Sequence, residues 1–267
     1  QVGEFNFIDT HVYRRLAQLH IGPAELCSDA EYLRRVYLDL IGTLPTACEA
    51  RAFLGSTETN RRAALVDHLL QRPEFAAYWA LKWADLLRVE RQALGHKGAY
   101  DFYRWLRASF AAGKPLDDLA REVGTAEGPL SDVPPANFYS AAKEPGKAAS
   151  TLSQVFLGVR IECAQCHHHP FDRWSQTDYF GMTAYFAQLQ KKNSPLGELL
   201  LTLGDPATTH PRTGERITAH ALGQPQPAKN PAGDRRRELA DWMTSSENPF
   251  FSRNLANRVW AHLLGRG

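Results

Sequence analysis

The chain has 267 residues and a mass of 29.9 kDa, with 43% hydrophobic and 22% charged residues. This composition allows a sizeable buried core and excludes a wholly disordered or collagen-like chain. The 31 basic and 29 acidic residues leave a net charge of +2, so no strong field would recruit nucleic acid or an anionic membrane. No stretch approaches the roughly 18 apolar residues that a transmembrane helix needs. The start at Gln1, without a signal-peptide pattern, is expected of a mature secreted protein or a fragment.

The first half of the chain predicts consecutive amphipathic helices. The strings beginning at Ser28 and Thr46 have the capping-box pattern, in which a hydroxyl and a glutamate satisfy free backbone amides at a helix start. Asn60 and Pro73 mark the starts of two further helices. The other helical segments of this half are residues 98–112 and 115–123.

The second half is less regular. From 124 to 145, Gly and Pro pairs interrupt the pattern and predict an irregular loop. Helix resumes at 147–158, and another helix is expected after a cap-like start at Ser175. Two helices, 234–245 and one that starts at Asn248, close the chain.

Residues 191–232 are rich in Gly and Pro, and only 199–203 and 216–222 have the composition of strands. A hairpin turn is predicted around 211–214. The predicted fold class is therefore mainly α: a multi-helix domain with a small irregular or β-hairpin segment near 199–222.

One short string carries specific chemistry. Cys163-Ala164-Gln165-Cys166-His167 has the C-x-x-C-H pattern of c-type haem attachment. Two cysteines separated by two residues on a helical turn lie on the same side, where each thiol can add to one vinyl group of a haem. His167 would then be the proximal iron ligand. Phe171 and Trp174 would pack against the apolar haem edge, so we expect one haem c on this turn.

Two other uses of the cysteine pair remain open. A redox dithiol or disulfide of the thioredoxin type would call for a βαβ context, which the sequence lacks. A tetrahedral zinc site would need a second Cys or His pair at matching spacing, and the other cysteines, Cys27 and Cys48, lie far upstream.

The residues around the motif, Cys163 to Gly181, resemble the planctomycete cytochrome-like domain PSCyt2, or DUF1549. Arg35 to Thr46 is similar to that family's R-x-Y-L-D-L-x-G-L-P-P-T stretch. Residues 248–251 and 257–262 resemble the opening of its partner domain, PSD1 or DUF1553. The resemblance implies a secreted, cytochrome-like module of unknown biochemical role, and it implies that the PSD1-like region continues past Gly267.

The resemblance also implies roles for individual residues. Cys163, Cys166 and His167 match the attachment motif, and His169 matches a histidine that follows it. We expect His169 to hydrogen-bond a haem propionate or to orient the loop. The expected organisation is a helical cytochrome domain over 1–190, an irregular segment over 191–232 and the helical start of a PSD1-like region over 233–267.

The distal iron ligand has two candidates. His210 precedes a Pro-Arg-Thr-Gly string in an irregular segment that could fold over the haem, and the family often has a similar string. Met182 could supply a thioether sulfur, although a lone methionine on an amphipathic helix more often packs in the core.

Two further expectations concern compartment and function. A Cys27–Cys48 disulfide, closing about 20 residues, would suit an oxidising compartment; the alternative is two unrelated thiols. We expect a periplasmic or extracellular electron-transfer protein whose partner is a redox protein or a larger membrane-associated or extracellular complex. The alternatives are an interaction or structural subunit in which haem is secondary, and a haem enzyme or sensor with an open distal site. No catalytic residue is assigned.

Overall fold

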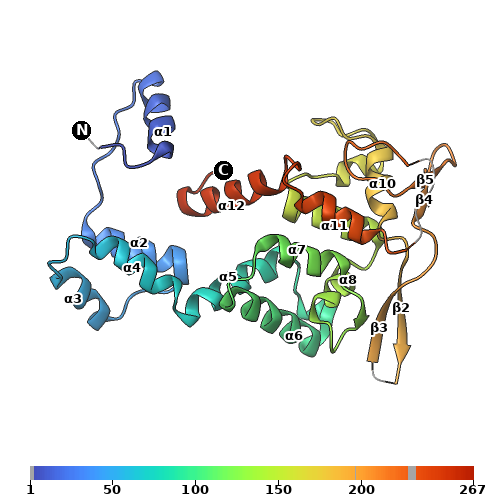
Figure 1. The fold of residues 1–267 in the computed structure, drawn as a ribbon, viewed down its shortest axis with the longest axis horizontal. Helices are drawn as coiled ribbons and strands as arrows, with labels where there is room; N and C mark the ends of the chain where they lie inside the picture. The colour runs from blue at the N-terminus through green and yellow to red at the C-terminus, as the bar shows by residue number, and fades with distance from the viewer. Residues whose placement is uncertain (1–2, 196, 228–232) are drawn as a thin grey trace. The chain divides into compact units, whose positions relative to one another are not determined.

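The computed structural model describes residues 3–195, 197–227 and 233–267 (Figure 1). These residues form twelve α-helices, short 3-10 and π segments, and two small antiparallel sheets. The prediction of a mainly α fold is therefore confirmed. The chain divides into two compact units, Gln1–Arg72 and Pro73–Gly267.

The first unit is helical throughout. Its helices are α1 (Phe7–Gln18), α2 (Asp29–Ile41), α3 (Ala47–Gly55) and α4 (Arg61–Leu70). Both predicted capping boxes are present, at Ser28 before α2 and at Thr46 before α3. The side chain of Asn60 makes no capping hydrogen bond, although α4 does begin after it. Helix α2 packs against α3 and α4 and buries Leu33 and Tyr37.

The expected Cys27–Cys48 disulfide is not seen, because both cysteines are free in the structure. Cys27 lies just before α2, whereas Cys48 lies in the first turn of α3. The length of α2 therefore separates the two positions along the chain. Cys48 is exposed, and the backbone carbonyl of Cys27 accepts a hydrogen bond from Arg62 (2.8 Å).

The second unit contains eight of the helices. They are α5 (Pro73–Leu86), α6 (Arg91–Ala111), α7 (Leu116–Thr125), α8 (Phe138–Ala142), α9 (Pro145–Leu152), α10 (Gln176–Ala184), α11 (Arg236–Thr244) and α12 (Phe251–Leu264). Helices α5 and α6 pack together, as do α7 and α11 (Figure 1). The core between the helices includes the fully buried rings of Phe102, Phe138, Phe156 and Phe186.

The segment 124–145 is more ordered than the sequence predicts. It contains the two-residue strand β1 (Gly128–Pro129), a 3-10 turn (Pro134–Asn137) and helix α8. The irregular-loop prediction was therefore wrong for its second half. Pro134 and Pro135 lie in the first turn of the 3-10 segment, where proline's missing N–H costs nothing, and buried Phe138 anchors the helix that follows.

Four of the strands, β2 to β5, lie between α10 and α11 in the chain, whereas β1 precedes α8. Strands β2 (Leu189–Ser194) and β3 (Gly197–Thr202) form a hairpin, and β1 pairs with the other edge of β3. The predicted strand 199–203 thus falls largely within β3, but its hairpin partner β2 was missed because the sequence Leu-Gln-Lys-Lys-Asn-Ser has no apolar alternation.

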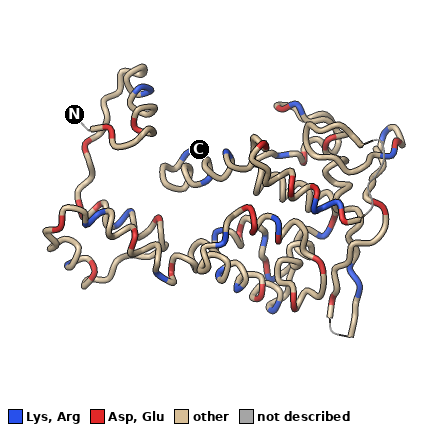
Figure 2. The backbone as a smooth tube through the Cα atoms, in the orientation of Figure 1, with Lys and Arg blue, Asp and Glu red and all other residues tan. Residues whose placement is uncertain are grey.

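The predicted hairpin around 211–214 is present. It joins β4 (Ala207–Thr209) to β5 (Arg216–Thr218) in a separate two-stranded sheet. Two parts of the Gly- and Pro-rich segment, residues 196 and 228–232, lie outside the described residues. Basic and acidic side chains are interspersed along the chain, in keeping with its small net charge (Figure 2).

Candidate functional site

The C-x-x-C-H string lies on a short turn held by the core. A π-helical segment ends at Gly158, which has a left-handed conformation (φ +71°) that favours glycine. The 3-10 turn Glu162–Gln165 follows. Residues three apart lie on the same side of such a turn. Ile161 and Ala164 are fully buried and fix it to the core, whereas Cys163 and Cys166 are exposed.

Neighbouring helices hold both ends of this turn. Glu162 forms an ion pair with Lys147 of α9, and this pairing raises the pKa of Lys147. At the other end, the backbone carbonyl of Gln165 accepts a hydrogen bond from the side chain of Gln176 (3.1 Å). Gln176 lies in the first turn of α10, whose predicted cap at Ser175 is present as a complete capping box. The sequence marked the cap but gave no signal for the roles of Glu162 and Gln176.

His167 is exposed, and its ring nitrogens are distinguished by one contact. Its Nδ1 lies 2.7 Å from the carbonyl oxygen of His168. A carbonyl oxygen only accepts, so Nδ1 carries the proton of the neutral imidazole and Nε2 keeps the lone pair. Metal-binding histidines commonly have this arrangement, with one nitrogen donating to a carbonyl and the other free to ligate.

His169 has the opposite arrangement. Its Nδ1 accepts a hydrogen bond from the backbone N–H of Phe171 (3.2 Å), which leaves the proton of the neutral ring on Nε2. The backbone N–H of His169 also donates to the carbonyl of Trp174 (2.8 Å) and closes the loop 169–174. The free Nε2–H can therefore act as a donor, which is the role expected for this residue.

The two aromatic residues predicted beside the haem lie in different surroundings. Phe171 is 95% exposed at the tip of the closed loop. Trp174 is only 3% exposed, with its ring beside Phe250 and under the guanidinium of Arg173. The buried Nε1–H of Trp174 has no hydrogen-bond partner among the described residues. Five other buried side-chain polar atoms, among them Nε1 of Trp79, likewise have no partner among the described residues, so this feature is not specific to the cysteine turn.

The two candidates for the distal ligand are both buried. Met182 is 1% exposed on the inner side of α10, within the core. His210 is 7% exposed at the start of the β4–β5 turn, beside the ring of Phe180. Its Nδ1 accepts hydrogen bonds from the backbone N–H groups of Arg212 (3.2 Å) and Thr213 (3.3 Å). This gives His210 a role in the turn, and iron ligation by either residue stays a prediction.

His220 is a second buried histidine, and the sequence predicted no role for it. The Nδ1 of His220 lies 2.8 Å from the carbonyl of Thr218, and its ring lies directly over Gly181 of α10. A methyl group at Gly181 would overlap the imidazole. Gly181 ends the string that resembles the family's motif, and its lack of a side chain lets the segment after β5 approach α10.

The donor set of this turn suits the covalent attachment of a haem c. Two exposed thiols on one turn can each form a thioether, and His167 offers Nε2 to iron. No three His, Cys, Asp or Glu side chains gather as a metal site in the part of the chain that the structure describes. On the loop that follows the motif, the Nε2–H of His169 suits a propionate of a haem.

No helix within residues 3–195, 197–227 and 233–267 is both long and apolar enough to cross a membrane.

Comparison with known proteins gives one family for most of the chain. The model of PSCyt2, described as a protein of unknown function (DUF1549), matches residues 7–191. A second model, PSD1, also described as a protein of unknown function (DUF1553), matches residues 235–267. No curated protein and no solved structure matches the chain. The chain thus carries the C-x-x-C-H turn within a match that covers more than half of its length, and it belongs to the PSCyt2 (DUF1549) family.

Proposed function

We propose that this chain is a c-type cytochrome that carries one haem on Cys163 and Cys166 and transfers electrons. The observation that carries the proposal is the arrangement of the turn: two exposed thiols three positions apart, followed at once by an imidazole with Nδ1 bound to a carbonyl. The family name, which hints at a cytochrome, supports the same reading.

In this proposal each residue has a defined task. Cys163 and Cys166 bind the cofactor covalently, and His167 offers Nε2 as the proximal ligand, oriented by its Nδ1–H. His169 would donate a hydrogen bond from Nε2 to a carboxylate at the cofactor's edge, and the ring of Trp174 would pack beside the cofactor. When bound, haem c supplies a one-electron iron centre.

The proposed location follows from the same chemistry. Covalent c-type attachment takes place outside the cytoplasm, so we place the protein in the periplasm or outside the cell. Its partner would be a redox protein or a larger membrane-associated or extracellular complex.

One observation favours a second candidate, an interaction subunit. Phe171 exposes almost its whole ring on the same loop as the cysteine motif. A large exposed aromatic side chain is typical of a residue that inserts into a partner. The experiment below separates the two candidates, because an interaction subunit needs no covalent haem.

The test is to produce the chain in a host that attaches c-type haem and to denature it before measuring bound haem. The unaltered chain is expected to retain haem after denaturation, and the double variant Cys163→Ser/Cys166→Ser to retain none. The double variant Cys27→Ser/Cys48→Ser is the matched control and is expected to retain haem fully. Equal haem content in both double variants, or none in the unaltered chain, would overturn the proposal and favour the interaction subunit.

A further inference from the structure

Helix α12 caps the π-helical segment Ser153–Leu157, which leads into the cysteine turn. The last carbonyls of a helical segment have no partner within it. Here the side-chain amide of Asn254 donates to the carbonyl of Val155 (2.7 Å). The guanidinium of Arg258 donates to the same carbonyl (3.1 Å) and to the carbonyl of Gln154 (2.7 Å). Two side chains from a distant part of the sequence therefore hold the end of this segment.

The charge of Arg258 serves this cap and no ion pair. No carboxylate pairs with its guanidinium in the described part of the chain, and burial alone lowers the pKa of Arg258. The carbonyl end of a helical segment carries a partial negative charge, which a cation stabilises. The partly buried guanidinium therefore has its compensation in the carbonyls of Gln154 and Val155.

The close approach of α12 requires glycine at position 158. A methyl carbon on Gly158 would lie 2.7 Å from Oδ1 of Asn254, which is too close for a real contact. The left-handed conformation of Gly158 favours glycine independently. The next residue, Val159, donates its N–H back to the carbonyl of Ser153 (3.1 Å). Helix α12 thus contacts the chain where it leaves the π-helical segment and turns toward the cysteines.

The start of α12 also contacts the chain on the other side of the motif. The ring of Phe251 stacks on the ring of Phe156, with centroids 6.3 Å apart. Phe250, the residue before α12, lies edge-on to the ring of Trp174 at 6.0 Å. Phe156 precedes the C-x-x-C-H motif and Trp174 follows it. Residues 250–258 therefore hold the chain on both sides of the attachment turn.

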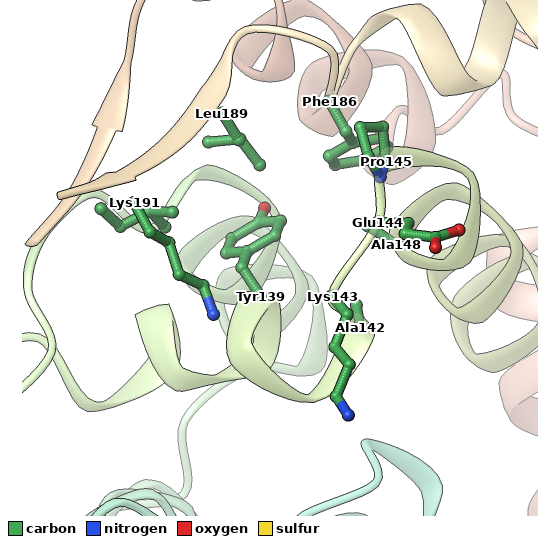
Figure 3. Close-up of a pocket in the computed structure, with 10 residues that line it drawn as sticks. Tyr139, Ala142, Lys143, Glu144, Pro145, Ala148, Phe186, Leu189 and Lys191 are labelled. Atoms are coloured by element: carbon green, nitrogen blue, oxygen red, sulfur yellow. The ribbon is translucent and has the colours of Figure 1, made fainter. Parts of the chain in front are cut away.

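The opposite end of the supporting segment is less closely packed. Helix α9 runs directly into the π-helical segment, and its first turn borders a cavity of about 280 Å³. Figure 3 shows Pro145 and Ala148 of α9 among the residues that line this cavity. Atoms beside a cavity lack part of the packing contacts that a filled core provides. The segment is therefore less constrained at its start than at its end, where α12 caps it.

We propose that Asn254 and Arg258 are positioning residues for the attachment turn. By fixing residues 154–159 they set the orientation in which His167 meets the cofactor. The segment matched by the PSD1 model would then be part of the cytochrome site. This inference rests on the proposed function, because it assigns the two side chains a role in holding haem.

The first test is amide hydrogen exchange in the haem-free chain. Arg258→Met is expected to speed exchange at Val159 and Ala164 about tenfold, because the segment before the turn loses its cap. Arg253→Met, at an exposed position of the same helix, should change these rates by less than about twofold. Arg258→Lys should recover part of the protection, since lysine keeps the charge and a donor. The amide of buried Leu106 should be unaffected in all three variants.

The second test is electron paramagnetic resonance of the oxidised, haem-loaded chain. The unaltered chain and Arg253→Met are expected to give one iron species, and Arg258→Met two or more, because the ring of His167 is no longer held in one orientation. Unchanged exchange in Arg258→Met, equal acceleration at Leu106, or one iron species common to all chains would each overturn the inference while haem attachment stands. An unaltered chain that attaches no haem would overturn the proposed function, and this inference with it.

Discussion

The sequence around His210 is compatible with two roles for its side chain, an iron ligand and a hydrogen-bond acceptor within a turn. The His-Pro-Arg-Thr-Gly string predicts a distal iron ligand by resemblance, yet its Nδ1 accepts two backbone hydrogen bonds inside the β4–β5 turn. An iron-bound histidine usually donates from the nitrogen that is not bound to metal. With Nδ1 accepting in the turn, a neutral His210 carries its proton on Nε2, so ligation of iron through Nε2 would require that this proton be lost. Iron ligation by His210 therefore stays a prediction, beside the role in the turn that the structure shows.

The first prediction uses this difference. His210→Ala is expected to destabilise the second unit by about 1 kcal/mol, since two backbone N–H groups lose their acceptor. His210→Asn is expected to recover much of that loss, because an asparagine oxygen accepts from the same backbone positions in an Asx-turn. Denaturant unfolding followed by tryptophan fluorescence measures both, since all six tryptophans lie in the second unit. If His210→Asn alters the absorption spectrum of the haem-loaded protein, His210 is an iron ligand and the turn role is insufficient.

Among the elements, those with local signals were predictable. The capping boxes at Ser28, Thr46 and Ser175 were all predicted, because their hydrogen bonds connect residues three apart. Helix α1 was not predicted, although Asn6 and Asp9 form the same kind of capping box at its start, and strands β2 and β4 and helix α8 were missed as well. Strand β2 is mostly polar and is held by pairing with β3, and α8 is anchored by the distant core, so their stabilising contacts are not local.

The same distinction applies to the candidate site. The spacing of Cys163, Cys166 and His167 predicted the C-x-x-C-H motif, and a helical turn was expected there. The burial of Ala164 that turns both cysteines outward depends on the surrounding core, and so does the orphaned N–H of Trp174. Neither has a signature in the sequence.

The second prediction concerns the cap of α3. Hydrogen bonds from the backbone and hydroxyl of Thr46, with a further contribution from Arg72, lower the pKa of Glu49 from 4.5 to about 2. A carboxyl with a lower pKa in the folded state stabilises that state above its unfolded pKa and loses this contribution as the pH falls through its folded pKa. The stabilisation is therefore complete well above pH 4.5, decreases as the pH falls below that value, and is fully lost only below the folded pKa of about 2.

Glu49→Gln is expected to destabilise the first unit at pH 7 by about 1 kcal/mol, a value reduced by the partial exposure of the carboxylate. At pH 2 most of the difference from the unaltered chain should be gone, because Glu49 is then largely protonated in the unfolded state and half protonated in the folded state. Amide hydrogen exchange in α3 measures it, and Glu58→Gln, an exposed glutamate of the same unit, is the control. A destabilisation that is independent of pH would show that the cap does not act through its charge.

At the scale of the whole molecule, the two family matches share one core. Arg236, in the PSD1 match, has no exposed side-chain surface. Its guanidinium donates to the carbonyl of Ala126 and the hydroxyl of Thr202 (both 2.8 Å) and pairs with Asp234. It also lies over the ring of Tyr139. Helix α11 is thereby fixed to α7, α8 and β3, so residues 235–267 are part of the second unit's fold.

The third prediction follows from this network. Arg236→Met is expected to destabilise the second unit by about 3–5 kcal/mol, because it leaves a carboxylate and a buried carbonyl without their partner. Arg237→Met, at the exposed neighbouring position, should change stability by less than about 0.5 kcal/mol. Unfolding followed by tryptophan fluorescence compares the two. Similar stabilities would show that the 235–267 segment is not an integral part of this core.

The central claim, covalent haem on the C-x-x-C-H turn, is tested most directly by an absorption spectrum. The protein should be purified from a host that attaches c-type haem and recorded oxidised and reduced, before and after denaturation. We predict c-type bands that sharpen on reduction and stay with the denatured polypeptide. A colourless protein, or haem that separates from the chain on denaturation, would contradict the claim.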